Sequence, residues 1–201
     1  MSDCACHVEI SEREQRRVLI PLLLINGLMF VVEMTFGLIG QSTGLIADSM
    51  DMLADATVYG IAMYAVGREL QAKVRAAHIS GVFQVVLAFG VLLDAARRFI
   101  FGSSPESTLM VVMGLAALVA NVICLMLIAK HRNGEIHMRA SWVFSKNDVI
   151  ANVGVIVGGA MVALFSSPLP DLIIGCAISI MVMMGGLSII RGARETSDSI
   201  Y

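Results

Sequence analysis

The stretch IADSMDMLAD, residues 46–55, places three aspartates inside an apolar run that is long enough to cross a bilayer. On an α-helix the side chains of Asp48, Asp51 and Asp55 fall within about 60° of one another, so they form one stripe. Inserting three ionised aspartates near the centre of a membrane would cost about 7–10 kcal/mol. A single stripe at this cost predicts that the carboxylates hold a divalent cation or protons.

A second polar group lies in the apolar run over 140–165. Asp148 and Asn152 are four residues apart and share a helix face, whereas Asn147 points about 100° away. Oxygen ligands on two facing helices suit a divalent cation, because two or three carboxylates neutralise its charge. The alternative is that these residues form interhelical hydrogen bonds and share protons, and only hold the helices together.

Three further polar residues lie in apolar runs: Asn26, Glu33 and Asn121. Asn26 and Glu33 are seven residues apart and therefore share a helix face. We expect packing or hydrogen-bonding roles for all three. For Asp48, metal ligation and a role at the N-terminus of its helix stay open.

The composition identifies a membrane protein. The chain has 201 residues, of which 57% are hydrophobic and 15% charged, whereas a soluble domain usually carries about 25% charged residues. The net charge of −2 and the lack of a basic patch exclude nucleic-acid binding. No nucleophile constellation, phosphate-binding loop or cofactor motif is present, so we expect neither an enzyme nor a prosthetic group.

Apolar runs of about 20 residues predict an all-α polytopic protein with six transmembrane helices. We place a cytoplasmic tail over 1–16, a transmembrane domain over 17–193 and a short tail over 194–201. The predicted helices cover 17–40, 44–67, 77–98, 107–130, 140–165 and 170–191.

The positions of Lys and Arg predict the orientation, because positive residues in short loops stay on the cytoplasmic side. They precede the first helix, join the second to the third and the fourth to the fifth, and follow the sixth. Only Arg97 and Arg98 fall on the opposite side, where Asp94 can pair with one of them. Both termini are therefore expected in the cytoplasm, and the expected location is a bacterial inner (plasma) membrane.

These residues resemble the cation diffusion facilitator family of divalent-metal transporters. IADSMDMLAD is similar to the signature of that family's second helix, and the stretch over 26–37 and the DLIIG stretch over 171–175 also resemble the family. The resemblance implies six transmembrane helices, cytoplasmic termini and a metal site. It implies that Asp51 and Asp55 are ligands that face Asp148.

The chain departs from the family pattern at the first ligand position of the fifth helix. That position is Phe144, which cannot bind a metal ion. We take Asn152 as the first candidate for the fourth ligand, with Asn147, Ser145, Asp48 or water as alternatives.

The chain also resembles a short member of the family. Members usually carry a cytoplasmic domain after the sixth helix, and that domain supports dimerisation. Here only residues 195–201 clearly remain. We therefore expect a homodimer that forms through the transmembrane helices.

The resemblance implies that the protein exports a divalent metal from the cytoplasm by antiport with protons and alternating access. It implies zinc first and cadmium second, although an oxygen-rich site would also suit manganese. Two alternatives stay open: a structural or regulatory subunit that transports nothing, and a passive channel.

Two peripheral features stay open. Cys4, Cys6 and His7 have side chains that zinc prefers, but they are equally well explained as incidental residues of the N-terminal tail. Lys146 is expected to extend to the membrane interface, or to pair with Asp148 when no metal is bound.

Overall fold

The computed structural model describes residues 2–65, 69–129 and 136–198, and every regular element in these ranges is an α-helix. The helices are α1 (Ser2–Ile39), α2 (Thr43–Ala65), α3 (Leu70–Phe101), α4 (Ser107–Ala129), α5 (Ile136–Phe165) and α6 (Leu169–Asp198). The prediction of an all-α protein with six helices is confirmed.

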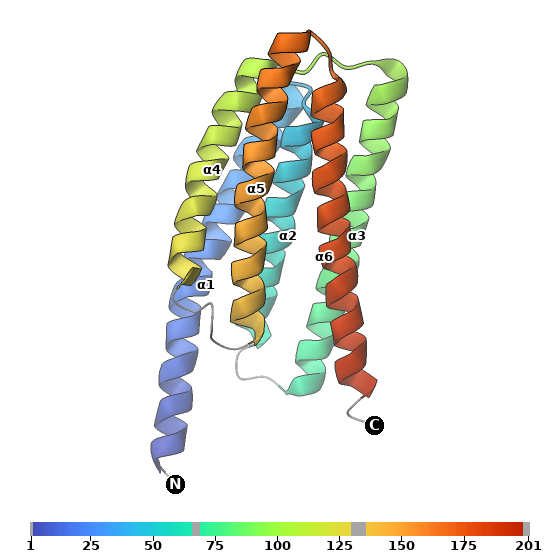
Figure 1. The fold of residues 1–201 in the computed structure, drawn as a ribbon. Coiled ribbons are helices and arrows are strands. Elements are labelled where there is room, and N and C mark those ends of the chain that lie inside the picture. The colour runs from blue at the N-terminus through green and yellow to red at the C-terminus, as the bar shows by residue number, and fades with distance from the viewer. Residues whose placement is uncertain (1, 66–68, 130–135, 199–201) are drawn as a thin grey trace.

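Five of the helices contain segments that are long and apolar enough to span a membrane. These segments are Arg17–Ile39, Leu70–Phe101, Ser107–Ala129, Ser145–Phe165 and Leu169–Ser197. The remaining helix, α2, carries the three aspartates. Its 23 residues span about 34 Å, and it runs beside the other helices in the bundle (Figure 1). The chain is a multi-pass integral membrane protein.

The helices extend beyond the predicted apolar runs. The helix α1 begins at Ser2, inside the segment expected to be a tail, and α6 continues to Asp198. Hydropathy marks only the part of a helix that suits lipid, whereas backbone hydrogen bonding continues through polar residues. The boundaries of the membrane domain stay predictions.

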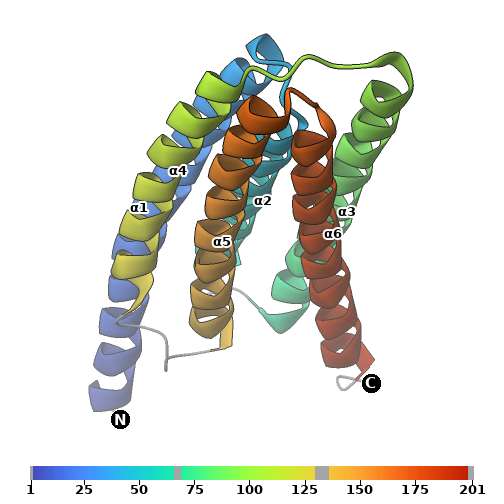
Figure 2. The same ribbon diagram turned by 45° about the horizontal axis from the view of Figure 1, so that its top comes forward.

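Both termini lie at the same end of the bundle (Figure 1). The links from α1 to α2, from α3 to α4 and from α5 to α6 lie at the opposite end, as the tilted view also shows (Figure 2). This arrangement agrees with an even number of crossings. The assignment of the terminal end to the cytoplasm rests on the distribution of Lys and Arg.

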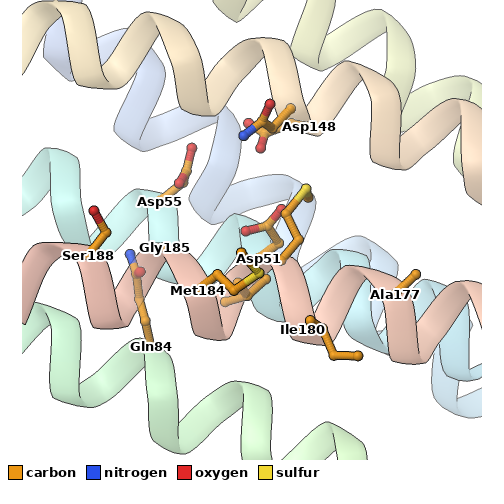
Figure 3. A pocket seen from close by; sticks show the side chains of 12 residues that line it. Asp51, Asp55, Gln84, Asp148, Ala177, Ile180, Met184, Gly185 and Ser188 are labelled. Carbon is orange, nitrogen blue, oxygen red and sulfur yellow. The ribbon is translucent and has the colours of Figure 1, made fainter.

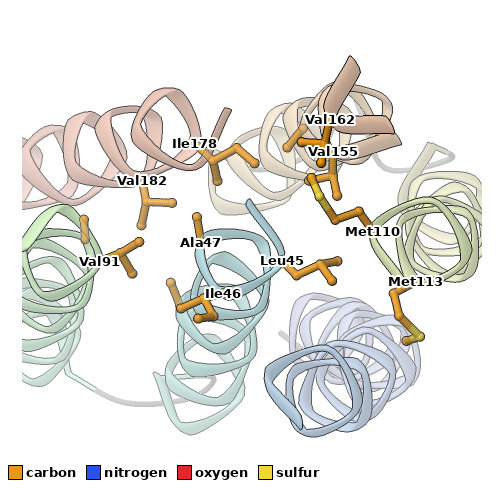
Figure 4. Close-up of a cluster of buried hydrophobic side chains, with 13 residues drawn as sticks. Leu45, Ile46, Ala47, Val91, Met110, Met113, Val155, Val162, Ile178 and Val182 are labelled. Carbon is orange, nitrogen blue, oxygen red and sulfur yellow. The ribbon is translucent and has the colours of Figure 1, made fainter. Parts of the chain in front are cut away.

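The helix α2 lies at the centre and contacts all five other helices. Its start packs among Met110 of α4, Val155 of α5 and Ile178 of α6 in a hydrophobic cluster that also includes Leu45 and Ala47 of α2 (Figure 4). A second cluster joins α1, α2 and α4 and contains Leu19, Leu22, Tyr59, Cys124 and Ile128. Ala54 of α2 also belongs to the first cluster, so Asp48 and Asp51 lie between residues of that cluster, and Asp55 lies between Ala54 and Tyr59 of the second cluster.

The start of α2 is held by a carboxylate from α6. The fully buried Asp171 accepts hydrogen bonds from the Ser42 hydroxyl at 2.6 Å and from the backbone N–H groups of Thr43 at 2.7 Å and Gly44 at 2.9 Å. Helix N-termini carry N–H groups without helical partners and favour negative charge. Asp171 therefore does from another helix what a capping residue usually does from the same chain segment.

A glycine one turn further along α6 allows this close approach. A Cβ atom on Gly175 would lie 2.6 Å from Cγ2 of Thr43 and 2.8 Å from its carbonyl carbon. No side chain fits there without moving the backbone of α2. Gly175 and Asp171 together set where α2 begins relative to α6.

The helices α3 and α6 form the most extensive packing pair in the described structure. At their crossing a Cβ atom on Gly81 would lie 2.7 Å from the carbonyl oxygen of Gly186, and one on Gly186 would lie 2.8 Å from that of Gly81. The two backbones meet because neither residue has a side chain.

Arg98 ties α3 to the turn between α1 and α2. Its Nη1 donates to the carbonyl of Gln41 at 2.5 Å, and its Nε donates to Asp94 at 2.5 Å. Arg97 also pairs with Asp94, at 2.7 Å. The expected partnership of Asp94 is present and involves both arginines.

We predict that Asp171→Ala will lower the free energy of unfolding by at least about 2 kcal/mol, because three buried donors lose their acceptor. Chemical unfolding in detergent micelles, followed by circular dichroism, measures this change. Glu69→Ala is the matched control, since Glu69 is the N-cap residue of α3 and its side chain makes no capping hydrogen bond. Equal effects of the two substitutions would contradict the capping role of Asp171.

Candidate metal site

A cavity of about 450 Å³ lies among α2, α3, α5 and α6. Its polar lining comes from Asp51 and Asp55 of α2, Gln84 of α3, and Asn147 and Asp148 of α5, and α6 adds Ser188. The apolar part comes from α6 through Ala177, Ile180, Met181, Val182, Met184 and Gly185. The close view shows the carboxylates of α2 and α5 and the amide of α3 around this space (Figure 3).

Three of the four predicted ligands line this cavity. Asp51, Asp55 and Asp148 are 9%, 4% and 6% exposed, and the Asp148 carboxyl group lies within hydrogen-bonding range of the other two. Asp51 and Asp55 are one turn apart on α2, and Asp148 lies near the middle of α5. The helix period on α2 and the contact between α2 and α5 thus bring three acids to one place.

The acids are close, but they do not yet surround one point. Among the described side chains, no group of three or more His, Cys, Asp or Glu residues is arranged to hold a metal ion. One oxygen of Asp51, Oδ2, is buried and has no hydrogen-bond partner in the described part of the chain. A cation or a proton would satisfy this oxygen, since a buried carboxylate oxygen without a partner is costly.

Tyr59 holds one of the cavity acids. Its hydroxyl donates to Oδ2 of Asp55 at 3.0 Å and lies 3.4 Å from the hydroxyl of Ser145. Both Tyr59 and Ser145 are fully buried. Ser145, an alternative candidate for the fourth ligand, therefore meets Tyr59 and is absent from the cavity lining.

Asn152, the first candidate for the fourth ligand, is also absent from the cavity lining. Its Oδ1 accepts from Asn121 at 3.0 Å, and its Nδ2 donates to Oδ2 of Asp48 at 2.6 Å. Both ends of the amide are thus used in bonds to α4 and α2. Asn147, one of the alternatives, lines the cavity instead, so the geometry favours Asn147 over Asn152.

Asp48 is separated from the other two aspartates of its stripe. Its carboxyl group lies within hydrogen-bonding range of Glu33 on α1 and accepts from Asn152, and it does not line the cavity. Asn26 is likewise used elsewhere, since its Nδ2 donates to the carbonyl of Leu22 at 2.9 Å. Its Nδ2 also lies 3.8 Å from Sγ of Cys124 on α4. Asn26 and Asn121 thus bond to neighbouring helices, and Glu33 lies beside Asp48.

Some predicted features lie outside the described side chains. Phe144, Cys4, Cys6 and His7 fall within helices, but their side chains are not among those described. Lys146 is exposed, and its Nζ lies 6.0 Å from the ring centre of Trp142. This is cation–π range, so Lys146 points to an aromatic ring at the end of the span.

Sequence reasoning missed two residues of the site, Tyr59 and Gln84. Tyr59 follows Asp55 by four residues, and this spacing on one helix face was the available signal. Gln84 is a single amide inside the apolar stretch VFQVVLAFGVLL. Its intramembrane position was a signal of function, but nothing in the sequence connects α3 with the aspartates.

A family model described as the cation efflux transmembrane domain matches residues 19–196. The vacuolar zinc transporter ZRC1 of Saccharomyces cerevisiae is 30% identical over 59% of this chain and 30% of its own. The metal cation efflux system protein CzcD of Cupriavidus metallidurans is 26% identical over 70% of this chain and 48% of its own.

A cadmium, cobalt and zinc/H(+)-K(+) antiporter of Bacillus velezensis is 22% identical over 97% of this chain and 64% of its own length. The chain therefore spans less than two thirds of each of these three relatives. The residues matched by the family model include all of those that line the cavity.

Asn152→Ala should lower the free energy of unfolding by about 2–4 kcal/mol, because both Asn121 and Asp48 lose a buried partner. Thermal unfolding of the purified protein in detergent, compared with the wild type, checks this. Asn147→Ala on the same helix serves as the control and should cost less stability, since Asn147 faces the cavity. A larger loss for Asn147→Ala would overturn this assignment of roles.

Proposed function

Because the chain belongs to the family of the cation efflux transmembrane domain, we propose that it exports a divalent metal ion from the cytoplasm in exchange for protons. The metal and the protons are cargo, and the site is the cavity among α2, α3, α5 and α6. Asp51, Asp55 and Asp148 bind the ion, and Asn147 is the candidate for a further oxygen ligand. The whole transport cycle rests on this site.

One observation carries the proposal: three nearly buried carboxyl groups from two helices line one cavity inside an apolar bundle. A single aspartate at the centre of a membrane helix costs about 2.5–3.5 kcal/mol. A divalent cation offsets this cost for several carboxylates at once. Acids that only formed hydrogen bonds between helices would not need to line a cavity.

Proton exchange follows from the same crowding. Without a metal ion, three neighbouring carboxyl groups in a medium of low dielectric constant cannot all stay ionised. At least one must therefore hold a proton, which an arriving cation displaces. Because the histidine position of the family is Phe144 here, the coupling rests on carboxyl groups alone.

The packing of the bundle supports alternating access. The cavity lies between the α3–α6 pair on one side and α2 with α5 on the other. Movement of one group against the other would change which end of the cavity is open, as expected for transport about a site inside the membrane.

The metal is proposed to be zinc, with cadmium as a second ion. The names of the relatives include zinc, cadmium and cobalt. The polar groups that line the cavity are carboxyl, amide and hydroxyl groups, which would also accept manganese. We propose the plasma membrane as the location and a homodimer formed through the membrane helices.

Flux measurements separate the antiporter from the two alternatives. A structural or regulatory subunit would move no metal in proteoliposomes, and a channel would move metal without counter-movement of protons. The antiporter moves protons against the metal, and its flux follows an imposed proton gradient.

We predict that Asp51→Asn, Asp55→Asn or Asp148→Asn will reduce zinc-driven proton movement at least about tenfold. Each change removes a charge that binds the metal and a group that carries the proton. A pH-sensitive dye inside proteoliposomes measures this movement. Glu106→Gln is the control, because Glu106 is exposed and caps α4 through Leu109 N–H at 3.0 Å, which the amide oxygen can still accept. Unchanged proton movement in the three aspartate variants would contradict the assignment of these residues to the transport site.

A further inference from the structure

Gln84 is a buried amide that faces the cavity and has no hydrogen bond in the described structure. Its side chain is 4% exposed, and it lines the same space as Asp51, Asp55 and Asp148. Buried amides are nearly always paired, because an unpaired one costs about 1–3 kcal/mol. A buried amide that lines a cavity and has no partner is therefore a candidate ligand for an ion that enters the cavity.

The path of Gln84 into the cavity depends on the crossing of α3 and α6. Gly81, one turn before Gln84, meets the backbone of Gly186. A Cβ atom on Gly186 would lie 3.0 Å from the Cβ atom of Gln84. Because α6 carries only glycine at 185 and 186, the side chain of Gln84 passes this helix and reaches the space beside Gly185 and Ser188 (Figure 3).

The chemistry of the amide suits the place. A carboxamide has an oxygen acceptor and an N–H donor at its end, and rotation about the last bond exchanges them. Its oxygen is a good ligand for hard and borderline cations. In the metal-free protein the N–H group can face a carboxylate, and with metal present the oxygen can face the ion.

We propose that Gln84 is a further ligand of the transported cation, supplied by α3, so that its oxygen helps to complete the set formed by Asp51, Asp55 and Asp148. This inference rests on the proposed function. It adds a third helix to the site and supplies an oxygen where Phe144 of α5 offers no ligand. It also connects α3 directly to the ion. Metal binding then links the α3–α6 pair to α2 and α5 across the cavity.

Isothermal titration of the purified full chain in detergent, with ZnCl₂ and MnCl₂ as separate titrants, tests this inference. Gln84→Leu keeps the approximate volume and removes the amide, and it should weaken binding of both ions about tenfold or more. Gln84→Glu keeps an oxygen at the same reach and should bind at least as tightly as the wild type. Gln71→Leu is the matched control on the same helix, because Gln71 is exposed, and it should bind as the wild type does.

The outcomes separate this inference from the proposed function. Wild-type affinity in Gln84→Leu, together with weak binding in Asp148→Asn, overturns the role of Gln84 and leaves the carboxylate site standing. Equal weakening in Gln84→Leu and Gln84→Glu also overturns it, since the residue would then act through packing. If the wild-type chain binds neither ion, both the site and the role of Gln84 fall. Metal-free thermal unfolding of each variant identifies any loss that comes from misfolding.

Discussion

The structure depends on keeping the carboxyl groups of α2 away from lipid. A helix with Asp48, Asp51 and Asp55 can lie inside a membrane only if protein surrounds it, because lipid offers these groups no partner. The helix α2 meets this condition by contacting all five other helices. The outer helices can then be apolar toward lipid, and each needs only a few polar groups on its inner face. The acids thus require α2 to lie at the centre of the bundle, with the remaining helices packed around it.

The helix α6 sets the geometry around this centre with small residues and one carboxylate. Asp171 and Gly175 fix the start of α2, and Gly186 lets α3 approach until the backbones meet. The same approach places Gln84 of α3 at the cavity. An apolar helix with little chemistry of its own therefore controls the positions of acids on α2 and of an amide on α3. Its glycines allow the backbones of α2 and α3 to approach α6 closely.

The sequence predicted the six helices because the bilayer imposes a length and an apolar character on each crossing. It also predicted that Asp51, Asp55 and Asp148 would meet, since spacing places the first two on one face and the resemblance points to the third. It left the role of Asp48 open, because the helix period gives the face of a residue but not the neighbour that covers it. Gln84 was missed for a related reason, since the acids that line the cavity with it lie on other helices and only the packing of α3 against α6 brings it to them.

The bond between Asp48 and Asn152 explains how one stripe of acids serves two purposes. Asn152 lies one turn after Asp148 on α5, and Asp48 lies just under one turn before Asp51 on α2. The 2.6 Å hydrogen bond between Asp48 and Asn152 therefore fixes the register in which α5 lies against α2, and in this register Asp148 comes within reach of Asp51. Asp48 need not touch the ion to matter for it. The acid at the end of the stripe aligns two helices, and that alignment is what allows the other acids to share one cavity.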